Sequence, residues 1–348
     1  MGTKGGSSAV RLPNHWYVAC RSGDIGARPI SRTVLDQPLV LFRGSAGVAA
    51  FLDRCPHRNA PLSLGRVDGD VLQCAYHGWR FDRLGHCVAI PALTDGSDAK
   101  ARNVTSFPVV EQDGFVWVFA NPEARPASAP RRFPHFGEAG YTSVVREFML
   151  QAALFPAIEN VLDVPHTAFL HRGLFRSELR GLEIKANVRR GKDTVEAEYL
   201  GEPRPAGLAA FLLSPSGGVV THFDRFLLPS VAQVEYRLGT ENHVVITSAH
   251  TPVSDFETRL YAVASFRLRF PGWLVRPILT PIALRIFRQD AEVLREQARN
   301  IQRFGGEKFA STEIDVLGPH ILRLLKDAER GDTAQDGTVE EHQVTLRL

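Results

Sequence analysis

"RCPHRNAPLSLGRVDGDVLQCAYHGW", residues 54–79, contains two of the four cysteines and two of the twelve histidines of this 348-residue chain. They form the pairs Cys55-x-His57 and Cys74-x-x-His77, on two arms separated by the sixteen residues 58–73. Thiolates and imidazoles are common ligands of zinc and of iron–sulfur clusters. This stretch therefore predicts a metal site.

Two kinds of metal site fit this ligand set. Zinc accepts two cysteines and two histidines in one tetrahedral site. A mixed-ligand [2Fe–2S] cluster instead places two thiolates on one iron and two imidazoles on the other. A zinc finger usually takes its cysteines from one knuckle and its histidines from a helix, whereas each arm here supplies one of each. The spacing favours the two-iron cluster, with zinc as the alternative.

A second group of polar residues lies in "ENVLDVPHTAFLHRG", residues 159–173. Asn160, Asp163 and His166 follow one another at three-residue steps and are expected on one face of a helix. His171 would point elsewhere on a continuous helix, but Pro165 disfavours ideal helix and could bring it back beside His166. Two histidines and a distant carboxylate form the facial triad of non-haem Fe(II) sites. On the residues alone, two ordinary core or loop histidines remain the alternative.

Taken together, the two motifs resemble those of the Rieske non-haem iron oxygenases. The resemblance is carried by "CPHR", "CAYHGW" and the Asp-x-x-His-x-x-x-x-His spacing about ninety residues later. It implies that Cys55 and Cys74 bind one cluster iron, that His57 and His77 bind the other, and that His166 and His171 bind a mononuclear Fe(II).

The resemblance also assigns three further residues. The third iron ligand in the family is an acid on a long C-terminal helix, which here indicates Asp290 on the helix expected over 281–304. Glu292 and Glu296 are the alternatives, as is a solvated Asp290 paired with arginine. Asp163 is expected to link His166 to the neighbouring subunit's cluster as an electron bridge, and Asn160 to lie near the iron.

The distribution of strand-like and helix-like segments along the chain predicts an α+β protein with two main domains. Short strand-like runs fill residues 16–122, and later strands and helices fill 144–330. By resemblance these are an all-β Rieske domain and a helix-grip (START-like) antiparallel-sheet catalytic domain with the mononuclear iron. Residues 1–15 are expected to be an extension, 123–143 a linker rich in proline, and 331–348 a polar, loosely held tail.

Composition narrows the setting. The net charge of +3 is small, which argues against nucleic-acid binding. No signal peptide or membrane-spanning run is evident, and the few cysteines suggest a reducing cytoplasm. The apolar stretch 270–287 is expected to be a buried or half-buried helical segment, with membrane contact as the alternative. No nucleotide-binding fingerprint is seen, so a separate NAD(P)H-dependent reductase or ferredoxin is expected to supply electrons.

The resemblance implies a terminal oxygenase component that hydroxylates or oxidatively demethylates a largely apolar, aromatic or polycyclic small molecule with O2. Alternatives are a cis-dihydroxylating dioxygenase, a desaturase, or a Rieske electron carrier or ligand-binding protein whose iron site has lapsed. A bridge between subunits implies a head-to-tail homotrimer.

Two further sets of residues are given provisional roles. The phenylalanines expected near the pocket are Phe155, Phe169, Phe175, Phe211, Phe223 and Phe226. The arginines around the cluster motif are candidates for docking an acidic electron donor: Arg54, Arg58, Arg66, Arg80 and Arg83.

Overall fold

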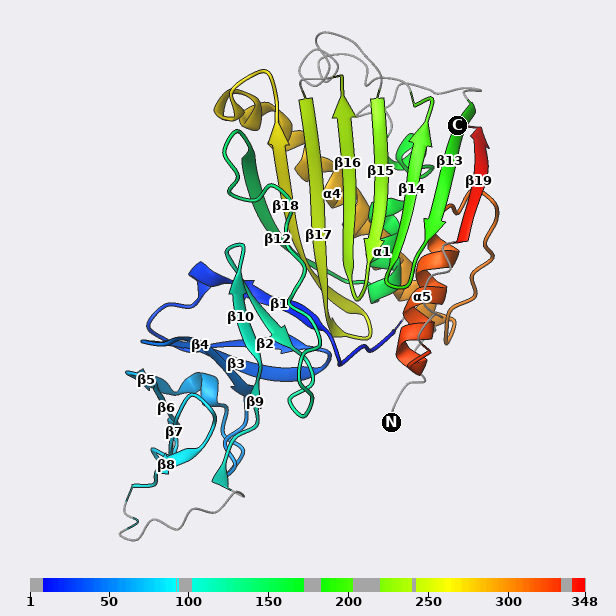
Figure 1. Cartoon of the computed structure of the whole chain (residues 1–348). Helices are drawn as coiled ribbons and strands as arrows, with labels where there is room; N and C mark the ends of the chain where they lie inside the picture. The colour runs from blue at the N-terminus through cyan, green and yellow to red at the C-terminus, as the bar shows by residue number, and fades with distance from the viewer. Residues whose placement is uncertain are drawn as a thin grey trace. The chain divides into compact units, whose positions relative to one another are not determined.

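The computed structural model of the chain describes residues 9–91, 93, 102–171, 183–202, 220–239, 242–332 and 340–347 (Figure 1). The chain divides into two compact units. One unit is Pro13–Arg132, and the other joins the N-terminal residues up to Leu12 with everything from Phe133 onward. The α+β prediction is confirmed, because strands dominate the first unit and a sheet with helices forms the second.

The unit Pro13–Arg132 consists of small antiparallel sheets and short 3-10 turns in its described part. Its three sheets have the orders β1-β11-β10, β2-β3-β4-β9 and β5-β6-β7-β8. The strands are β1 (Trp16–Arg21), β2 (Ile30–Val34), β3 (Gln37–Gly44), β4 (Gly47–Leu52), β5 (Arg66–Asp68), β6 (Val71–Gln73), β7 (Arg80–Phe81), β8 (Cys87–Ala89), β9 (Ser106–Phe107), β10 (Val109–Gln112) and β11 (Phe115–Phe119). The two cysteine–histidine arms lie in loops between these strands, one after β4 and one between β6 and β7.

The β5–β8 sheet holds the loops that carry the first candidate site. Its apolar side chains join those of β3 and β4 in one core, with Phe42, Phe51, Leu62 and Phe81 all fully buried. Cys55 and Cys74 belong to the same core. The two loops are therefore anchored by their cysteines in packed apolar surroundings.

Gly65 marks the closest approach between these loops. A Cβ atom at this position would lie 2.2 Å from the carbonyl oxygen of Gln73 and 2.9 Å from that of Leu62. We expect Gly65→Ala to lower the free energy of unfolding by about 1–3 kcal/mol, because backbone beside Cys74 must shift. Thermal melting followed by circular dichroism measures this, with Gly23→Ala as the control because a Cβ there meets nothing within 4 Å. Equal melting of the two variants would contradict the prediction.

The second unit is built on one antiparallel sheet of eight strands in the order β12-β18-β17-β16-β15-β14-β13-β19. The strands are β12 (Thr142–Leu150), β13 (Glu183–Arg190), β14 (Thr194–Leu200), β15 (Val220–Leu227), β16 (Val231–Leu238), β17 (Asn242–Ser254), β18 (Glu257–Arg267) and β19 (Glu340–Arg347). Its helices are α1 (Leu154–Leu162), α2 (Thr167–Leu170), α4 (Gly272–Arg303) and α5 (Gly318–Arg330). Figure 1 shows α1 and α4 behind the same face of this sheet.

Helix α1 packs directly on this sheet. Leu154, Ile158 and Leu162 repeat at four-residue steps and are buried with Phe226 of β15 and Leu325 of α5. This spacing places one apolar stripe of a short helix against the core. The stripe fixes α1, and with it the polar residues at its C-terminal end, over the middle of the sheet.

Two sequence-based expectations differ from the structure. Residues 340–347, expected in a loosely held tail, form β19 and pair with β13 over eight residues, with Leu346 buried against the core. The helical segment expected over 270–287 and the helix expected over 281–304 form one helix, α4, but the start of α4 is not buried as expected, since Trp273 and Leu274 are 75% and 46% exposed. Pro277 and Pro281 lie inside it on solvent-exposed positions, where the missing N–H groups leave carbonyls that water can reach. No described helix is both long enough and apolar enough to cross a membrane.

The sheet face that carries Phe226 also holds a buried charged group. Both ring nitrogens of His222 face carboxylates, with Nδ1 2.7 Å from Glu202 Oε2 and Nε2 3.0 Å from Asp224 Oδ1. The ring lies between Tyr199 and Tyr236, its register partners on the adjacent strands. Burial lowers the pKa of His222, but Asp224 and Glu202 outweigh it and raise that pKa to about 9. His222 is therefore an imidazolium at neutral pH.

This imidazolium makes stability depend on pH. Because the folded-state pKa lies above the unfolded value, its contribution is fully present below about pH 6.5 and is lost as pH rises through about 9. We expect the free energy of unfolding to fall by on the order of a few kcal/mol across that window. Urea unfolding at a series of pH values measures it. In His222→Gln the decline should be much shallower, and an equally steep decline would show that another group causes it.

Candidate metal centres

The two cysteine–histidine arms fold into loops with the same hydrogen bonds. In the first loop the Cys55 N–H donates to Ala60 O and the Asn59 N–H donates to Cys55 O, both at 2.9 Å. In the second loop the Cys74 N–H donates to the carbonyl five residues later at 2.8 Å, and Gly78 N–H donates to Cys74 O at 3.1 Å. Asn59 and Gly78, at equivalent places, both have left-handed backbones with φ of 61° and 72°. The two arms thus form loops with matching backbone conformations.

The four side chains segregate by type. The thiols of Cys55 and Cys74 are buried and close enough to hydrogen-bond, while the imidazole rings of His57 and His77 lie 4.5 Å apart nearer the surface. Trp79 stacks on the His57 ring at 4.8 Å and holds its plane. A pair of sulfurs beside a pair of imidazoles suits a cluster with different ligands on its two irons.

Two further observations test whether a cluster fits these residues. His57 Nδ1 is buried and has no hydrogen-bond partner in the described part of the chain. Burial raises the pKa of the Cys55 thiol to about 11, so a thiolate there needs a nearby positive charge. The two irons of a cluster would satisfy one of these atoms each, and the residues therefore fit a [2Fe–2S] group.

The second group of residues is brought together by a break in the chain. Helix α1 ends at Leu162, and Asp163 has an extended backbone with φ −89° and ψ 102°. The expectation that Asn160, Asp163 and His166 share one helix face is therefore wrong beyond Asn160, because Pro165 keeps the helix from continuing. The chain turns and restarts as the short helix α2. This turn places His166 Nε2 3.2 Å from His171 Nε2, as the irregularity at Pro165 predicted.

The carboxylate of Asp290 on α4 completes the group. Its Oδ1 lies 3.0 Å from His171 Nε2 and 3.6 Å from His166 Nε2. Glu292 and Glu296 instead face solvent, with side chains 70% and 53% exposed and arginines beside them. Among the histidines, cysteines, aspartates and glutamates of the described residues, only His166, His171 and Asp290 form a set of three whose ligand atoms all lie within 4.8 Å of one another.

Hydrogen bonds aim both imidazoles at the same point. His166 Nδ1 faces the Asp163 backbone carbonyl and, at 3.4 Å, its carboxylate. His171 Nδ1 lies 3.0 Å from Gln289 Oε1. Both acceptors favour a proton on Nδ1 and leave an Nε2 lone pair directed toward Asp290. Burial lowers the pKa of His166, yet Asp163 and Asp290 raise it to about 9 overall, which reflects how much negative charge surrounds this ring.

The spacing of these atoms fits a metal ion. Ligands about 2.1 Å from a first-row metal and at right angles to one another lie about 3 Å apart. The three measured separations are 3.0, 3.2 and 3.6 Å. A cation there would accept the two imidazole lone pairs and offset the charge of the Asp290 carboxylate. The donor set leaves the remaining coordination positions open, as an oxygen-activating iron requires.

Gln289 is a functional residue that sequence reasoning missed. It precedes Asp290 on α4, and its carbonyl oxygen accepts the Nδ1–H of His171, which is only 2% exposed. Asn160 lies on the other side, with its amide nitrogen 3.5 Å from Asp290 Oδ1. The one available signal for Gln289 was its position directly before the expected ligand. The structure thus shows a supporting contact for each of the three side chains.

Removing the Gln289 contact should weaken the site without destroying it. We expect Gln289→Ala to lower iron affinity or turnover by about 10- to 100-fold, since such supporting hydrogen bonds orient metal ligands. Gln289→Glu keeps an acceptor at the same place and should restore much of the loss. Iron titration of metal-depleted protein, read by calorimetry, measures the affinity. Wild-type affinity in Gln289→Ala would show that His171 needs no such orientation.

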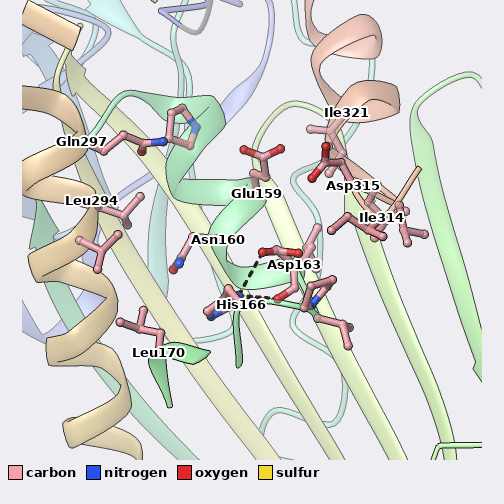
Figure 2. Close-up of a pocket in the computed structure, with 18 of the residues that line it drawn as sticks. Glu159, Asn160, Asp163, His166, Leu170, Leu294, Gln297, Ile314, Asp315 and Ile321 are labelled. Atoms are coloured by element: carbon pink, nitrogen blue, oxygen red, sulfur yellow. Dashed lines mark hydrogen bonds and ion pairs between the residues drawn. The ribbon is translucent and has the colours of Figure 1, made fainter. Parts of the chain in front are cut away.

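A cavity of about 240 Å³ opens beside this group (Figure 2). His166 and Asp163 lie on its wall, and three carboxylates face it, those of Glu159, Asp163 and Asp315. Burial raises the pKa of Glu159 to about 7, and Asp163 and Asp315 contribute to the shift. Leu294 of α4 and Ile321 of α5 line other parts of the wall. The cavity is thus acidic and touches the residue proposed to carry electrons.

The phenylalanines expected around the pocket mostly lie elsewhere. Phe155 and Phe226 are packed in the core of the unit, and Phe169 is 84% exposed. Phe223 alternates with Phe226 along β15 and so points to the opposite face of the sheet. Phe175 and Phe211 lie outside the described residues. Aromatic spacing alone does not separate cavity from core.

Two family models match the chain, one for each unit. Residues 15–108 match the Rieske [2Fe-2S] domain, and residues 151–330 match the vanillate O-demethylase oxygenase C-terminal domain. Since the second match covers more than half of the residues, the chain belongs to the Rieske non-haem iron oxygenases with this type of C-terminal domain. The expected cofactors, a Rieske [2Fe–2S] cluster and a mononuclear iron, are those of the family.

Individual relatives agree with this placement. The oxygenase component of dicamba O-demethylase from Stenotrophomonas maltophilia is 39% identical over 46% of this chain, and that match spans only about half, 47%, of the relative. The vanillate O-demethylase oxygenase subunit of a Pseudomonas species is 25% identical over 90% of this chain and 93% of its own. The crystal structure of dicamba monooxygenase bound to 3,6-dichlorosalicylic acid is 26% identical, has a TM-score of 0.79 and covers 94% of this chain and 100% of its own.

Proposed function

We propose that the protein is the terminal oxygenase component of a multicomponent system and that it hydroxylates or oxidatively demethylates a small, largely apolar aromatic molecule. The observation that carries this proposal is the triangle of His166 Nε2, His171 Nε2 and Asp290 Oδ1 in the same chain as the paired cysteines and histidines. When bound, the cluster would supply single electrons and the mononuclear iron would supply oxygen activation. One without the other would leave the chemistry incomplete.

The chain's own residues have distinct roles in this proposal. Cys55 and Cys74 would hold the buried iron of the cluster, and His57 and His77 the outer one. His166, His171 and Asp290 would hold the mononuclear iron. Asn160, whose amide lies near Asp290 Oδ1, would help keep that carboxylate in place. The domain division proposed from the sequence, 16–122 and 144–330 with a linker of 123–143, separates these two groups.

Electron delivery is proposed to cross between two copies of the chain. Asp163 contacts His166 and also faces the acidic cavity, so its carboxylate is available to a group entering from outside. The Rieske unit offers a complementary surface, because His77 is exposed and Arg54 and Arg58, both exposed, flank the first cluster loop. A bridge of this kind repeats from copy to copy and requires a closed head-to-tail ring, here a homotrimer. A separate reductase or ferredoxin would supply the electrons.

One face of the sheet has apolar side chains against which an apolar substrate could pack. Val234, Ile246 and Ala264 are register partners on three neighbouring strands, on the face that carries the helices. Ile246 is 37% exposed although it lies in the middle of its strand. An apolar ring could cover these small side chains and gain their burial. The names of two relatives, dicamba O-demethylase and vanillate O-demethylase, make demethylation the favoured reaction.

The metal content of anaerobically purified protein tests the proposal. The expected result is acid-labile sulfide with iron in excess of the cluster's requirement, together with the electron paramagnetic resonance signal of a reduced Rieske cluster. A surrogate reductase, NADH and a panel of methoxylated benzoates should then give formaldehyde coupled to O2 uptake. Zinc without sulfide would refute the oxygenase function. If both iron centres were present but no product formed, only the proposed substrate class would be refuted.

A further inference from the structure

The first half of α4 exposes an apolar surface that the proposed reaction does not use. Trp273 is 75% exposed and Leu274 is 46% exposed, and Pro277 is exposed one turn later. Residues at these spacings lie on one side of a helix. Val275, between them in sequence, is fully buried against the unit. The helix therefore rests on the protein with one side and presents a second apolar side outward.

The charged residues on α4 before Asp290 are all positive. Between Glu257 and Asp290 the chain has no aspartate or glutamate, but it has arginines at positions 259, 267, 269, 276, 285 and 288. Arg276, Arg285 and Arg288 lie on α4 itself and are exposed. In the described residues no ion pair joins any of these three to a carboxylate. An exposed apolar face with cations and without acids has the composition of an interfacial helix.

We propose that the first half of α4, around Trp273 and Leu274, docks onto an anionic lipid surface. The indole of Trp273 would enter the interfacial region, and the arginines would meet lipid phosphates. A second copy of the same face is a poor occupant, because arginine would oppose arginine. The combination of apolar side chains and cations is thus matched by a negatively charged headgroup layer above an acyl layer.

The two prolines limit how deep this docking can go. Pro277 and Pro281 have no N–H, so the carbonyls of Trp273 and Pro277 lose their usual intrahelical donors. Free carbonyls are costly in hydrocarbon and are satisfied by water among the headgroups. The helix therefore lies along the surface, with its apolar side chains reaching below the headgroups.

Sedimentation with vesicles tests this proposal on the full-length, cofactor-loaded protein. Vesicles of phosphatidylcholine alone are compared with vesicles that also contain phosphatidylglycerol. We expect binding to the anionic vesicles only, weakened by salt. Trp273→Ser combined with Leu274→Ser should reduce binding by about tenfold or more. Arg276→Gln should reduce it by about fivefold. Phe304→Ser is the matched control, because Phe304 is 78% exposed at the end of the same helix.

Each outcome decides the proposal. Loss of binding in the α4 variants with retention in Phe304→Ser supports it. Failure of the wild-type protein to bind anionic vesicles overturns it, as does equal binding by wild type and the Trp273/Leu274 variant. A partner other than lipid, such as an acidic protein, would leave the chain in the supernatant and so count against it. Far-ultraviolet circular dichroism checks that each variant is folded. The proposed oxygenase function is tested separately, by the iron content of the protein.

Discussion

Asp290→Ala is expected to lose the mononuclear iron and all turnover while it keeps the Rieske cluster. Asp290 Oδ1 lies within 3.0 Å of one imidazole nitrogen and 3.6 Å of the other, so its removal leaves two neutral ligands and no charge to offset the cation. Iron per chain should fall by about one equivalent, with acid-labile sulfide unchanged. Product formation with a surrogate reductase should fall below detection.

The control for this variant comes from the same helix. Glu292 lies two residues from Asp290, but its side chain is 70% exposed and faces Arg295. Glu292→Ala should retain wild-type iron and turnover. If Glu292→Ala lost iron and Asp290→Ala did not, the ligand assignment would be wrong. If both retained it, the mononuclear site would lie elsewhere or bind its iron without a carboxylate.

The second large effect is expected for Asp163→Asn, which should retain both metal centres but turn over about 10- to 100-fold more slowly. Its carboxylate lies 3.4 Å from His166 Nδ1 and faces the acidic cavity. The amide keeps the size of the side chain, while the backbone carbonyl still accepts from His166 and preserves the ligand. Reduction of the cluster by dithionite should be normal, and the loss should appear in the rate of cluster reoxidation when substrate and O2 are added.

A mixing experiment separates transfer between copies from transfer within one chain. Asp163→Asn lacks the bridge, and Cys74→Ser lacks the cluster, so each alone should be nearly inactive. Co-expression would form mixed rings in which an intact cluster faces an intact Asp163 on the next copy. Recovered activity supports transfer between copies. Activity that stays at the level of the separate variants contradicts it, provided native mass spectrometry shows that mixed rings formed.

Much of the site could be predicted because its chemistry requires rare residue types at fixed spacings. The cysteine and histidine pairs and the Asp163, His166 and His171 series are of this kind. Asp290 was indicated by the family resemblance, which implies an acid on a long C-terminal helix, and the apolar residues beside it favoured it over Glu292 and Glu296. Gln289 was not found, since an amide has no charge to mark it and its role depends on the orientation of His171. The expectation that Asn160, Asp163 and His166 share one helix face was wrong, because residue spacing does not show where the chain turns at Pro165.

The fold was predictable at the level of class and less so at its edges. Strand-like runs indicated the sheets, and the periodicity of α4 was evident from residue 281. Its earlier turns were expected as a separate helical segment over 270–287, but that segment was expected to be buried or half-buried, whereas Trp273 and Leu274 are exposed. Strand β19 was missed because its sequence, "EEHQVTLR", is polar at most positions. Pairing with β13 rather than its own hydrophobicity holds it in place.

The position of β19 has a consequence for how the protein is made. The sheet of the second unit is completed by residues 340–347, and its core also includes Val10 and Leu12 from near the start of the chain. This unit can therefore reach its final form only after residues 340–347 have left the ribosome. The Rieske unit, in contrast, takes all its strands from Pro13–Arg132 and can fold while the rest is still being translated. Its iron–sulfur cluster could thus be inserted during synthesis, before the mononuclear site exists.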